Sequence, residues 1–226
     1  MNALPLSERR EAIRRFAWAR DRNGLRSVQL PIDEDLEQAV LNNNYEAAKA
    51  ALEAGACADV TDEEQFHRVM MWAIFNNNPK MVELLIAHGA DANAEDQDGN
   101  PLLFEAVSAE SPNIEIVRLL LQAGANVMYE DASGFPAHFW AGKRNCTEVL
   151  ELLRVAGADI NWQDYRKRDV LMHTARSGSL QAAKYLLAYG SDPTRTDDSD
   201  MTAADLAREE GHEELAVLLE THKARL

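Results

Sequence analysis

Histidines and carboxylates are the side chains of this sequence whose types suit metal or acid–base chemistry. The histidines form no His-x-x-x-His pair, and no glutamate accompanies them in a zinc-protease pattern. The segment DQDGNPLLFE at 96–105 partly imitates a calcium-binding loop, but Ala94 occupies the first ligand position. The segment GKRN at 142–145 lacks the preceding glycine and the following hydroxyl residue of a phosphate loop. We therefore expect no catalytic residue, no metal and no cofactor.

Charge offers a second kind of chemistry, the recognition of a partner. The chain has 226 residues and a net charge of −15. Residues 31–130 hold 19 acidic and 4 basic side chains, whereas residues 161–195 carry a charge of +3. An acidic field favours encounter with basic partners and repels nucleic acid and anionic membranes. Improved solubility is the alternative interpretation of the same charge.

The compartment is indicated by cysteine usage and by the N-terminal stretch. Cys57 and Cys146 are too few for a disulfide framework, which favours a reducing compartment. In MNALPLSERREAIRRFAWAR, charges interrupt every apolar run, unlike in a secretory signal. The sequence contains no run of about 18 apolar residues, so we expect no membrane-spanning helix. The sequence thus predicts a cytoplasmic protein without membrane contact.

A recurring glycine supplies the framework that must position these side chains. It occurs in Gly55-Ala56, Gly89-Ala90, Gly124-Ala125, Gly157-Ala158 and Gly190-Ser191, at spacings of 34, 35, 33 and 33. Each glycine follows an apolar helical pattern such as MVELLIAHGA, where it is the expected residue after a helix because it readily adopts positive φ. A segment rich in Asp and Asn follows, such as DANAEDQDGN, and then a second short helix begins. This period predicts a repeat protein built from helix pairs.

The repeating unit resembles the ankyrin repeat, a helix-loop-helix unit of about 33 residues joined to the next by a β-hairpin-like finger. The family's Thr-Pro-Leu-His helix entry is present in altered form as PLLF at 101–104, PAHF at 136–139, DVLM at 169–172 and TAAD at 202–205. Phe104, Phe139 and Met172 occupy the histidine position of the family. The resemblance therefore implies that packing replaces the histidine hydrogen bonds between repeats.

The expected fold is an all-α ankyrin-repeat solenoid of about six units with fingers and an N-terminal capping helix. The predicted boundaries are 31–62, 63–95, 96–130, 131–163, 164–196 and 197–226, with a capping helix and linker at 1–30. Within 7–22, Ala12, Phe16 and Ala19 share one helical face that would cover the open end of the first repeat. The segment SAESPN at 108–113 adds two residues to a helix–helix turn and explains the spacing of 35.

Stacked repeats leave the fingers and the inner helices exposed as one concave surface. On this surface we expect acidic residues toward the N-terminal side and basic and aromatic residues toward the C-terminal side. The predicted partner-binding residues are Glu64, Asp96, Asp98, Glu105, Phe135, Trp140, Lys143, Arg144, Tyr165, Arg166, Arg168 and Arg176. For Trp140 the alternative interpretation is packing between the two helices of its own repeat.

These features favour a protein–protein interaction scaffold that has no enzymatic chemistry. The acidic excess favours an inhibitor or immunity-type protein that masks a basic partner, although an adaptor or a host-directed effector would have the same features. A hypothesis of another class is nucleic-acid or phospho-ligand binding by the basic finger at 165–168 with Lys143, Arg144 and Arg176. The net charge makes nucleic acid the weaker candidate.

Overall fold

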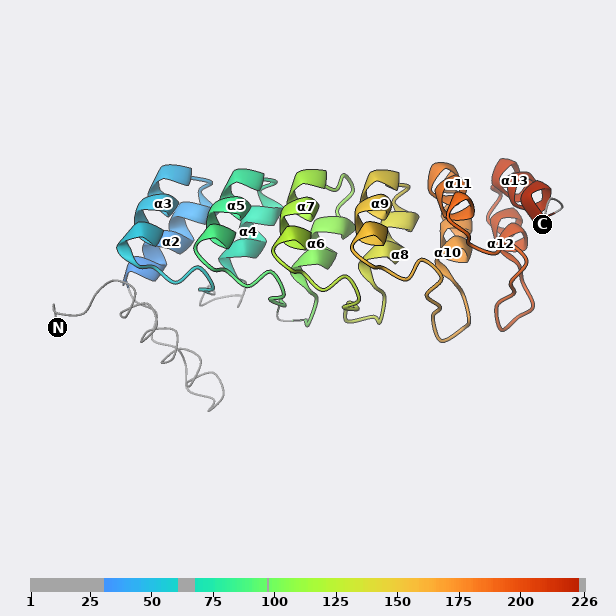
Figure 1. Ribbon diagram of the computed structural model, residues 1–226, viewed down its shortest axis with the longest axis horizontal. Helices are drawn as coiled ribbons and strands as arrows, with labels where there is room; N and C mark the ends of the chain where they lie inside the picture. Colours follow the sequence, from blue (N-terminus) through green and yellow to red (C-terminus); the bar gives the residue numbers. More distant parts are fainter. Residues whose placement is uncertain (1–30, 61–67, 97, 224–226) are drawn as a thin grey trace. The chain divides into compact units, whose positions relative to one another are not determined.

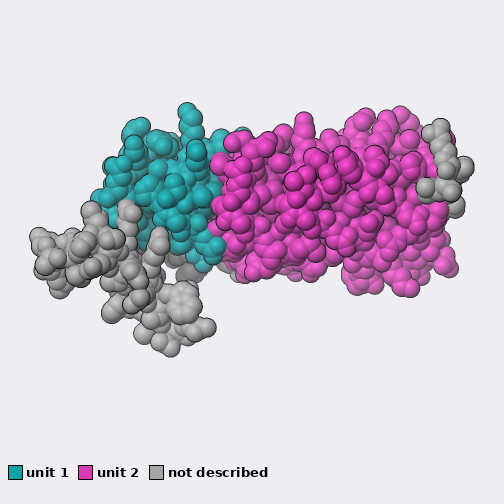
Figure 2. Space-filling model, viewed as in Figure 1, with its two compact units in different colours: residues 1–91 teal, residues 92–226 magenta. Residues whose placement is uncertain are grey.

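The structure is a computed structural model that describes residues 31–60, 68–96 and 98–223 of the chain. In these ranges the regular secondary structure consists of helices, which follow one another as six pairs (Figure 1). The chain divides into two compact units, residues 1–91 and residues 92–226 (Figure 2). The all-α repeat fold expected from the sequence is confirmed.

The N-terminal unit contains two helix pairs. The helices are α2 (Pro31–Leu41), α3 (Tyr45–Ala54), α4 (Val69–Phe75) and α5 (Pro79–Ala87). Helix α2 packs against α3 and α4, and α3 packs against α5, so that the two pairs are stacked. Leu36, Val40 and Leu52 are completely buried between them. Burial of these apolar side chains is the main stabilising contribution to the stack.

The C-terminal unit contains four further pairs. The first helix of each pair, which we call the inner helix, is α6 (Leu102–Ser108), α8 (Ala137–Lys143), α10 (Val170–Arg176) or α12 (Ala203–Glu209). The second, the outer helix, is α7 (Ile114–Gln122), α9 (Thr147–Val155), α11 (Leu180–Ala188) or α13 (Glu213–Lys223). Consecutive inner helices pack against each other, and so do consecutive outer helices. Each pair therefore buries its apolar residues against the next pair, as in other repeat proteins.

The recurring glycines end the outer helices, as the sequence predicts. Gly124 has φ 89° and Gly157 has φ 101°, and each follows the C-cap alanine of its outer helix, α7 or α9. A Cβ atom at either position would meet nothing within 4 Å, so the backbone conformation rather than crowding selects glycine there.

The inner helices begin where the altered Thr-Pro-Leu-His segments predict. Pro101 is the N-cap residue of α6, so it precedes the helix rather than opening it. Asp169 accepts a hydrogen bond from the backbone N–H of Met172 at 2.9 Å and caps α10. Thr202 and Asp205 form a reciprocal capping box at the start of α12.

The turn between α6 and α7 differs in length from the other helix–helix turns. Residues 109–113 form it, whereas three residues join the two helices of every other described pair. The two additional residues expected from the sequence are therefore present, and they account for the longer spacing between Gly89 and Gly124.

A hairpin-like finger precedes each inner helix of the C-terminal unit. Single antiparallel bridges close the fingers at Glu95–Pro101, Glu130–Pro136, Gln163–Asp169 and Thr196–Thr202. The four loops project from the same side of the unit (Figure 1). We name them after an acidic residue in each: the Asp96, Asp131, Asp164 and Asp197 fingers.

Two sequence predictions fall where the structure gives no description. The capping helix and linker at 1–30 and the acidic residue Glu64 lie outside the described residues. The six repeat boundaries stay predictions.

Candidate binding surface

One aspartate holds the backbone of each finger. Oδ1 of Asp131 accepts hydrogen bonds from the backbone N–H groups of Ser133 and Phe135 at 2.8 and 2.9 Å. The aspartates of the other three fingers accept the same pair of bonds from the residues two and four positions further along. These bonds satisfy backbone donors that a tight loop cannot pair with its own carbonyl groups. Asp96, predicted to bind a partner, therefore has a structural task in its own finger.

This set of four aspartates was missed in the sequence, although a signal for it exists. Asp96, Asp131, Asp164 and Asp197 are spaced by 35, 33 and 33 residues. The glycines that end the outer helices from Gly89 onward have the same three spacings. An aspartate that keeps the period of the repeat has a role in the repeat itself.

The second carboxylate oxygen of Asp96 accepts a hydrogen bond from a residue of its own finger. Oδ2 accepts a hydrogen bond from the side-chain NH₂ of Asn100 at 3.0 Å, and the side-chain Oδ1 of Asn100 accepts one from the backbone N–H of Ala132 at 3.0 Å. Asp98 is exposed at the tip of the same finger. No described basic side chain forms an ion pair with Asp96 or Asp98.

Glu105 extends this acidic group onto α6. Its side chain is half-buried, and burial raises its pKa above the ordinary value. Repulsion by Asp96 and Asp98 raises the pKa further, and no described cation opposes the shift. The three carboxylates, which we call the acidic group, therefore repel one another, and bound positive charge would relieve this repulsion.

Aromatic rings gather on α8 and on the fingers next to it. Phe135 stacks on Phe139 with ring centroids 4.2 Å apart and meets Trp162 edge-on at 5.8 Å. The indole N–H of Trp162 donates to Glu130 at 3.2 Å. Phe139, which occupies the histidine position of the family, is buried, and its ring also contacts His173. Phe135 and Trp162 are half-buried and keep part of their rings accessible.

Trp140 joins two inner helices and a finger. Its ring meets Phe104 of α6 edge-on at 5.7 Å, and its indole N–H donates to Oδ2 of Asp131 at 2.8 Å. The side chain is half-buried. These contacts are with α6 and with the Asp131 finger, and packing between the two helices of its own repeat stays a prediction.

Two basic residues follow Trp140 at the end of α8. The ammonium group of Lys143 lies 4.8 Å from the centre of a Trp140 ring, within the range of a cation–π contact. Arg144 donates from Nε to the backbone carbonyl of Ser108 at 3.2 Å. Both side chains are exposed, and neither forms an ion pair with a described acidic residue.

Arg168 in the Asp164 finger is paired with the following finger. Its Nε donates to Oδ2 of Asp197 at 2.8 Å, and the exposed fractions of the two side chains are 12% and 0%. Burial raises the pKa of Asp197, but hydrogen bonds from Arg168 and from the backbone outweigh it and hold the pKa below its ordinary value. This ion pair links the Asp164 finger to the Asp197 finger.

The other two arginines of this region are paired as well. Arg166 lies 3.8 Å from Asp198 of the next finger, and Arg176 lies 2.9 Å from Glu210 beyond α12. These two pairs are partly exposed. The structure therefore brings Arg166, Arg168 and Arg176 against carboxylates, whereas Arg144 has no described carboxylate partner.

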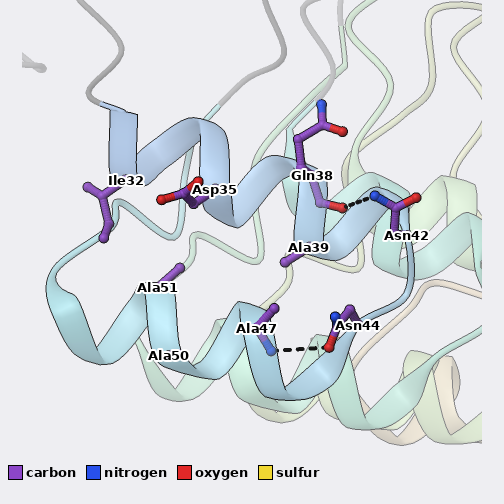
Figure 3. A pocket seen from close by; sticks show the side chains of 9 residues that line it. All are labelled: Ile32, Asp35, Gln38, Ala39, Asn42, Asn44, Ala47, Ala50 and Ala51. Carbon is purple, nitrogen blue, oxygen red and sulfur yellow. Dashed lines mark hydrogen bonds between the residues drawn. The ribbon is translucent and has the colours of Figure 1, made fainter.

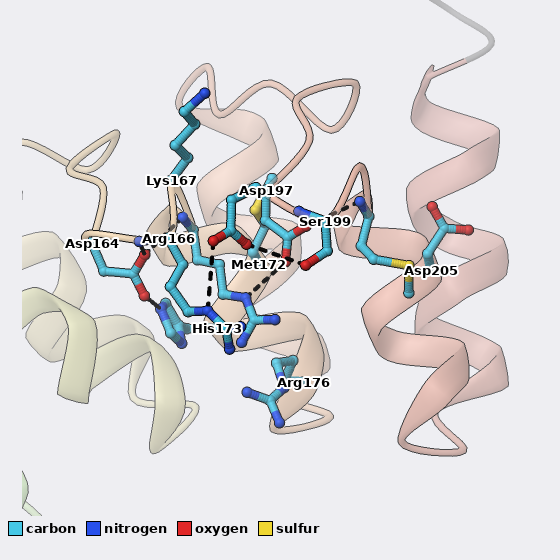
Figure 4. Close-up of polar contacts among 12 residues, drawn as sticks. Asp164, Arg166, Lys167, Met172, His173, Arg176, Asp197, Ser199 and Asp205 are labelled. Atoms are coloured by element: carbon cyan, nitrogen blue, oxygen red, sulfur yellow. Dashed lines mark hydrogen bonds and ion pairs between the residues drawn. The ribbon is translucent and has the colours of Figure 1, made fainter.

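Tyr165 and Lys167 form the tip of the Asp164 finger. Tyr165 is 90% exposed, the most exposed of the large hydrophobic side chains described. Lys167 has φ 59°, and its side chain extends away from the neighbouring ion pairs (Figure 4). Tyr165 thus offers an aromatic ring to solvent without a packing role in the chain.

A row of three side chains runs along the inner helices. Glu105, Trp140 and His173 stand at corresponding positions of α6, α8 and α10, directly after the family's histidine position. His173 lies 2.9 Å from Oδ2 of Asp164. Burial lowers the pKa of His173, and the hydrogen bond to Asp164 only partly opposes the shift. The row places a carboxylate, an indole and an imidazole on one face.

His138 is a buried polar residue that the sequence did not single out. Its side chain is 0% exposed, and neither ring nitrogen has a hydrogen-bond partner among the described residues. Burial lowers its pKa to about 4, with Asp159 opposing the shift. A usable signal was present, because Leu103 and Leu171 occupy the same position in α6 and α10.

The described ranges contain no cluster of His, Cys, Asp and Glu side chains that could hold a metal ion. Among the helices described, none is long and apolar enough to cross a membrane.

Comparison with known proteins defines the class. The family model of ankyrin repeats in three copies matches residues 36–131 and 138–225. The chain therefore belongs to the ankyrin-repeat family, whose members are protein–protein interaction scaffolds and are generally non-enzymatic.

Individual relatives are much longer than this chain. Ankyrin repeat protein nuc-2 from Neurospora crassa is 28% identical over 187 residues, which are 81% of this chain and 17% of that protein. The ADP-ribosylation factor GTPase-activating proteins AGD4 and AGD2 from Arabidopsis thaliana are each 42% identical over 74 residues, which are 31% of this chain and 10% of theirs. The chain thus spans 10–17% of the length of these relatives.

Proposed function

We propose that the chain binds a partner protein whose contact surface is basic, through the acidic group and the adjoining inner helices. The observation that carries this proposal is the grouping of Asp96, Asp98 and Glu105, three carboxylates without a described cationic partner; burial raises the pKa of Glu105, and repulsion by the two aspartates raises it further. A lysine or arginine of a partner placed between these carboxylates removes that repulsion and gains Coulomb attraction. The acidic group of the free protein therefore favours binding of a positively charged side chain.

The aromatic residues on α8 and on the fingers next to it support a protein as the partner. Phe135, Trp140 and Trp162 are half-buried and held by contacts with one another or with the fingers. Rigid aromatic side chains lose little conformational entropy on binding and dominate many protein interfaces. Tyr165 adds an exposed ring at the next finger tip.

The ion pairs of the C-terminal side favour a protein over nucleic acid. Phosphate binding draws on arginine and lysine side chains that are available to the ligand. Arg166, Arg168 and Arg176 are already paired with carboxylates. Their engagement leaves Lys143, Arg144 and Lys167 as the residues of this region that a phosphate backbone would have to use.

Within this proposal the chain acts as an inhibitor or immunity-type protein. It masks a basic surface by covering it, which requires binding but no chemistry. The support is the surplus of 19 acidic over 4 basic side chains across residues 31–130. An adaptor or a host-directed effector would use the same surface. We propose the cytoplasm as its compartment because only two cysteines occur in the chain.

Affinity capture with matched variants tests the proposal. The wild-type chain, a variant with Asp98→Asn and Glu105→Gln, and a control with Glu110→Gln and Glu148→Gln are each immobilised and exposed to lysate of the native cell. The control removes the same charge from exposed positions away from the acidic group. We expect the wild type and the control to retain a basic protein that the first variant loses.

Salt dependence adds a second criterion. Retention should fall when salt rises from low to moderate concentration, because electrostatic steering is screened. Equal capture by both double variants would exclude the acidic group from the interface. Recovery of nucleic acid by all three chains would favour phosphate recognition at Lys143, Arg144 and Lys167 instead.

A further inference from the structure

A groove runs between α2 and α3 in the first described helix pair (Figure 3). Its volume is about 510 Å³. Ile32, Ala39, Ala47 and Ala50 supply its apolar lining, and Asp35 and Gln38 stand at its α2 side. Ala47 and Ala50 are exposed although they lie within the outer helix α3. The groove therefore presents small apolar side chains to solvent.

The position of this pair in the array explains why the groove is open. Helix α8 packs against both α6 and α10, and α9 packs against both α7 and α11. Helices α2 and α3 pack against each other and against α4 and α5. Each pair of a repeat protein needs a cover on both sides, so the side of α2 and α3 away from the following pair needs one as well.

The pair α12 and α13 carries a charged residue where the pair α2 and α3 carries an apolar one. Arg208 of α12 lies five residues before the first residue of α13. Val40 of α2 lies five residues before the first residue of α3, so the two positions correspond. Val40 is completely buried, whereas Arg208 is exposed and pairs with Glu213 at 3.5 Å and Glu220 at 2.9 Å. Charge thus replaces an apolar residue at this position of α12. The groove of α2 and α3 has alanines instead.

We propose that residues 7–22 of the same chain dock as a helix in this groove. Ala12, Phe16 and Ala19 share one helical face of that segment. In the docked arrangement this face covers Ala47 and Ala50. The large ring of Phe16 fills space that the small alanine side chains leave.

Charge complementarity supports this occupant. Residues 1–30 contain seven arginines and three acidic residues, whereas residues 31–54 contain six acidic residues and one lysine. Asp35, at the groove, is exposed. Arginines that flank the apolar face of the docked segment meet these carboxylates, and attraction of opposite charges guides the contact.

The connection is long enough for docking. The residues between 22 and 31 span up to about 28 Å when extended, and α2 with its 11 residues is roughly 16 Å long. The segment is joined to Pro31, the first residue of α2, next to Ile32 at the groove. Residues 7–22 can therefore reach the whole groove within the same molecule. This contact is independent of the partner surface on the C-terminal unit.

Hydrogen exchange of α3 in the full chain tests the docking. Three variants are compared with the wild type: Phe16→Asp, Ala50→Arg and the combination of both. Each single substitution should remove the cover and lower the protection of α3 amides about tenfold, the effect of losing roughly 1.4 kcal/mol of apolar burial. The double variant should lose no more than either single variant, because both substitutions break the same contact.

The control and the opposing outcomes keep the test decisive. Ala87→Arg places the same charge at an exposed alanine of α5 outside the groove, and it should leave α3 unchanged. Unaltered protection in Phe16→Asp, or additive losses in the double variant, would overturn the proposal. Protection that rises with protein concentration would also overturn it, because a second copy would then be the cover.

Discussion

The Asp96 finger and the Asp164 finger are held by the same backbone hydrogen bonds, from the residues two and four positions after the aspartate. Around that common turn the charged side chains differ. At the Asp96 finger, Asp98 of the loop and Glu105 of the adjoining helix α6 have no described cationic partner. In the second, Arg166 and Arg168 pair with acidic residues of the next finger.

This difference separates two uses of charge on one scaffold. The ion pairs of the Asp164 finger are internal to the C-terminal unit, and they join its successive repeats. The acidic group has no such partner, so its field is directed at solvent and at whatever approaches from it. Net charge in a stretch of sequence therefore indicates a binding surface only after the internal pairs have been subtracted.

The largest expected effect follows from breaking the buried ion pair. Asp197→Ala removes two backbone hydrogen bonds and leaves Arg168 almost buried without its partner, which should cost about 4 kcal/mol of unfolding free energy. Asp96→Ala removes the same kind of turn but no ion pair, and should cost about 1 kcal/mol. Urea unfolding of both variants measures the difference.

A conservative variant separates the two contributions at Asp197. Asp197→Asn keeps an oxygen that can accept the turn hydrogen bonds and removes the charge. It should retain part of the stability that Asp197→Ala loses. Equal losses for the alanine variants at positions 96 and 197 would show that the ion pair contributes nothing beyond the turn.

Acid should lower the free energy of unfolding through His138. This residue lies in α8, which follows the Asp96 finger and precedes the Asp164 finger in the sequence. Its pKa is about 4 in the folded chain, below the ordinary value of 6.5, so folding disfavours the protonated form. His138 therefore leaves the free energy of unfolding unchanged above pH 6.5 and lowers it as the pH drops toward 4. The loss should be about 3 kcal/mol, since a difference of one in pKa corresponds to about 1.4 kcal/mol.

His138→Leu provides the matching measurement. Leucine occupies this position in α6 and α10, and it has no polar atoms to leave unpaired. The variant should lack the loss between pH 6.5 and 4 in urea unfolding. Parallel pH profiles for the two chains would assign the acid sensitivity to other groups.

The fold was predictable from the sequence, and the ion pairs were not. Glycines such as Gly124 mark the ends of outer helices locally, because few other residues adopt positive φ at low cost. The pairing of Arg168 with Asp197 and of Arg176 with Glu210 joins residues 29 and 34 positions apart. It depends on side-chain direction in adjacent repeats, which composition does not encode. The burial of His138 likewise depends on two neighbouring helices.

A smaller effect should follow from exchanging the residues at the two finger turns. Gly99 and Lys167 both stand three residues after the finger aspartate, and both have positive φ, 82° and 59°. Gly99→Lys should cost about 1 kcal/mol because a side chain is strained in that region. Lys167→Gly should gain about 0.5 kcal/mol, since the greater freedom of glycine in the unfolded chain offsets part of the relief. Urea midpoints that move in the same direction for both variants would contradict a common turn.

The smallest expected change in the free energy of unfolding has opposite signs at Glu105 and at Arg176. Glu105 has a raised pKa, so its ionised form is disfavoured in the folded chain at neutral pH, and Glu105→Gln should stabilise by about 0.5 kcal/mol. Arg176 belongs to an exposed ion pair with Glu210, and Arg176→Gln should destabilise by about 0.5 kcal/mol. Both changes should shrink in 1 M salt, where the screening length is about 3 Å. Urea unfolding at low and high salt measures all four values. Destabilisation by Glu105→Gln would mean that an internal cation compensates Glu105, and the contrast between a paired and an unpaired region would then no longer hold.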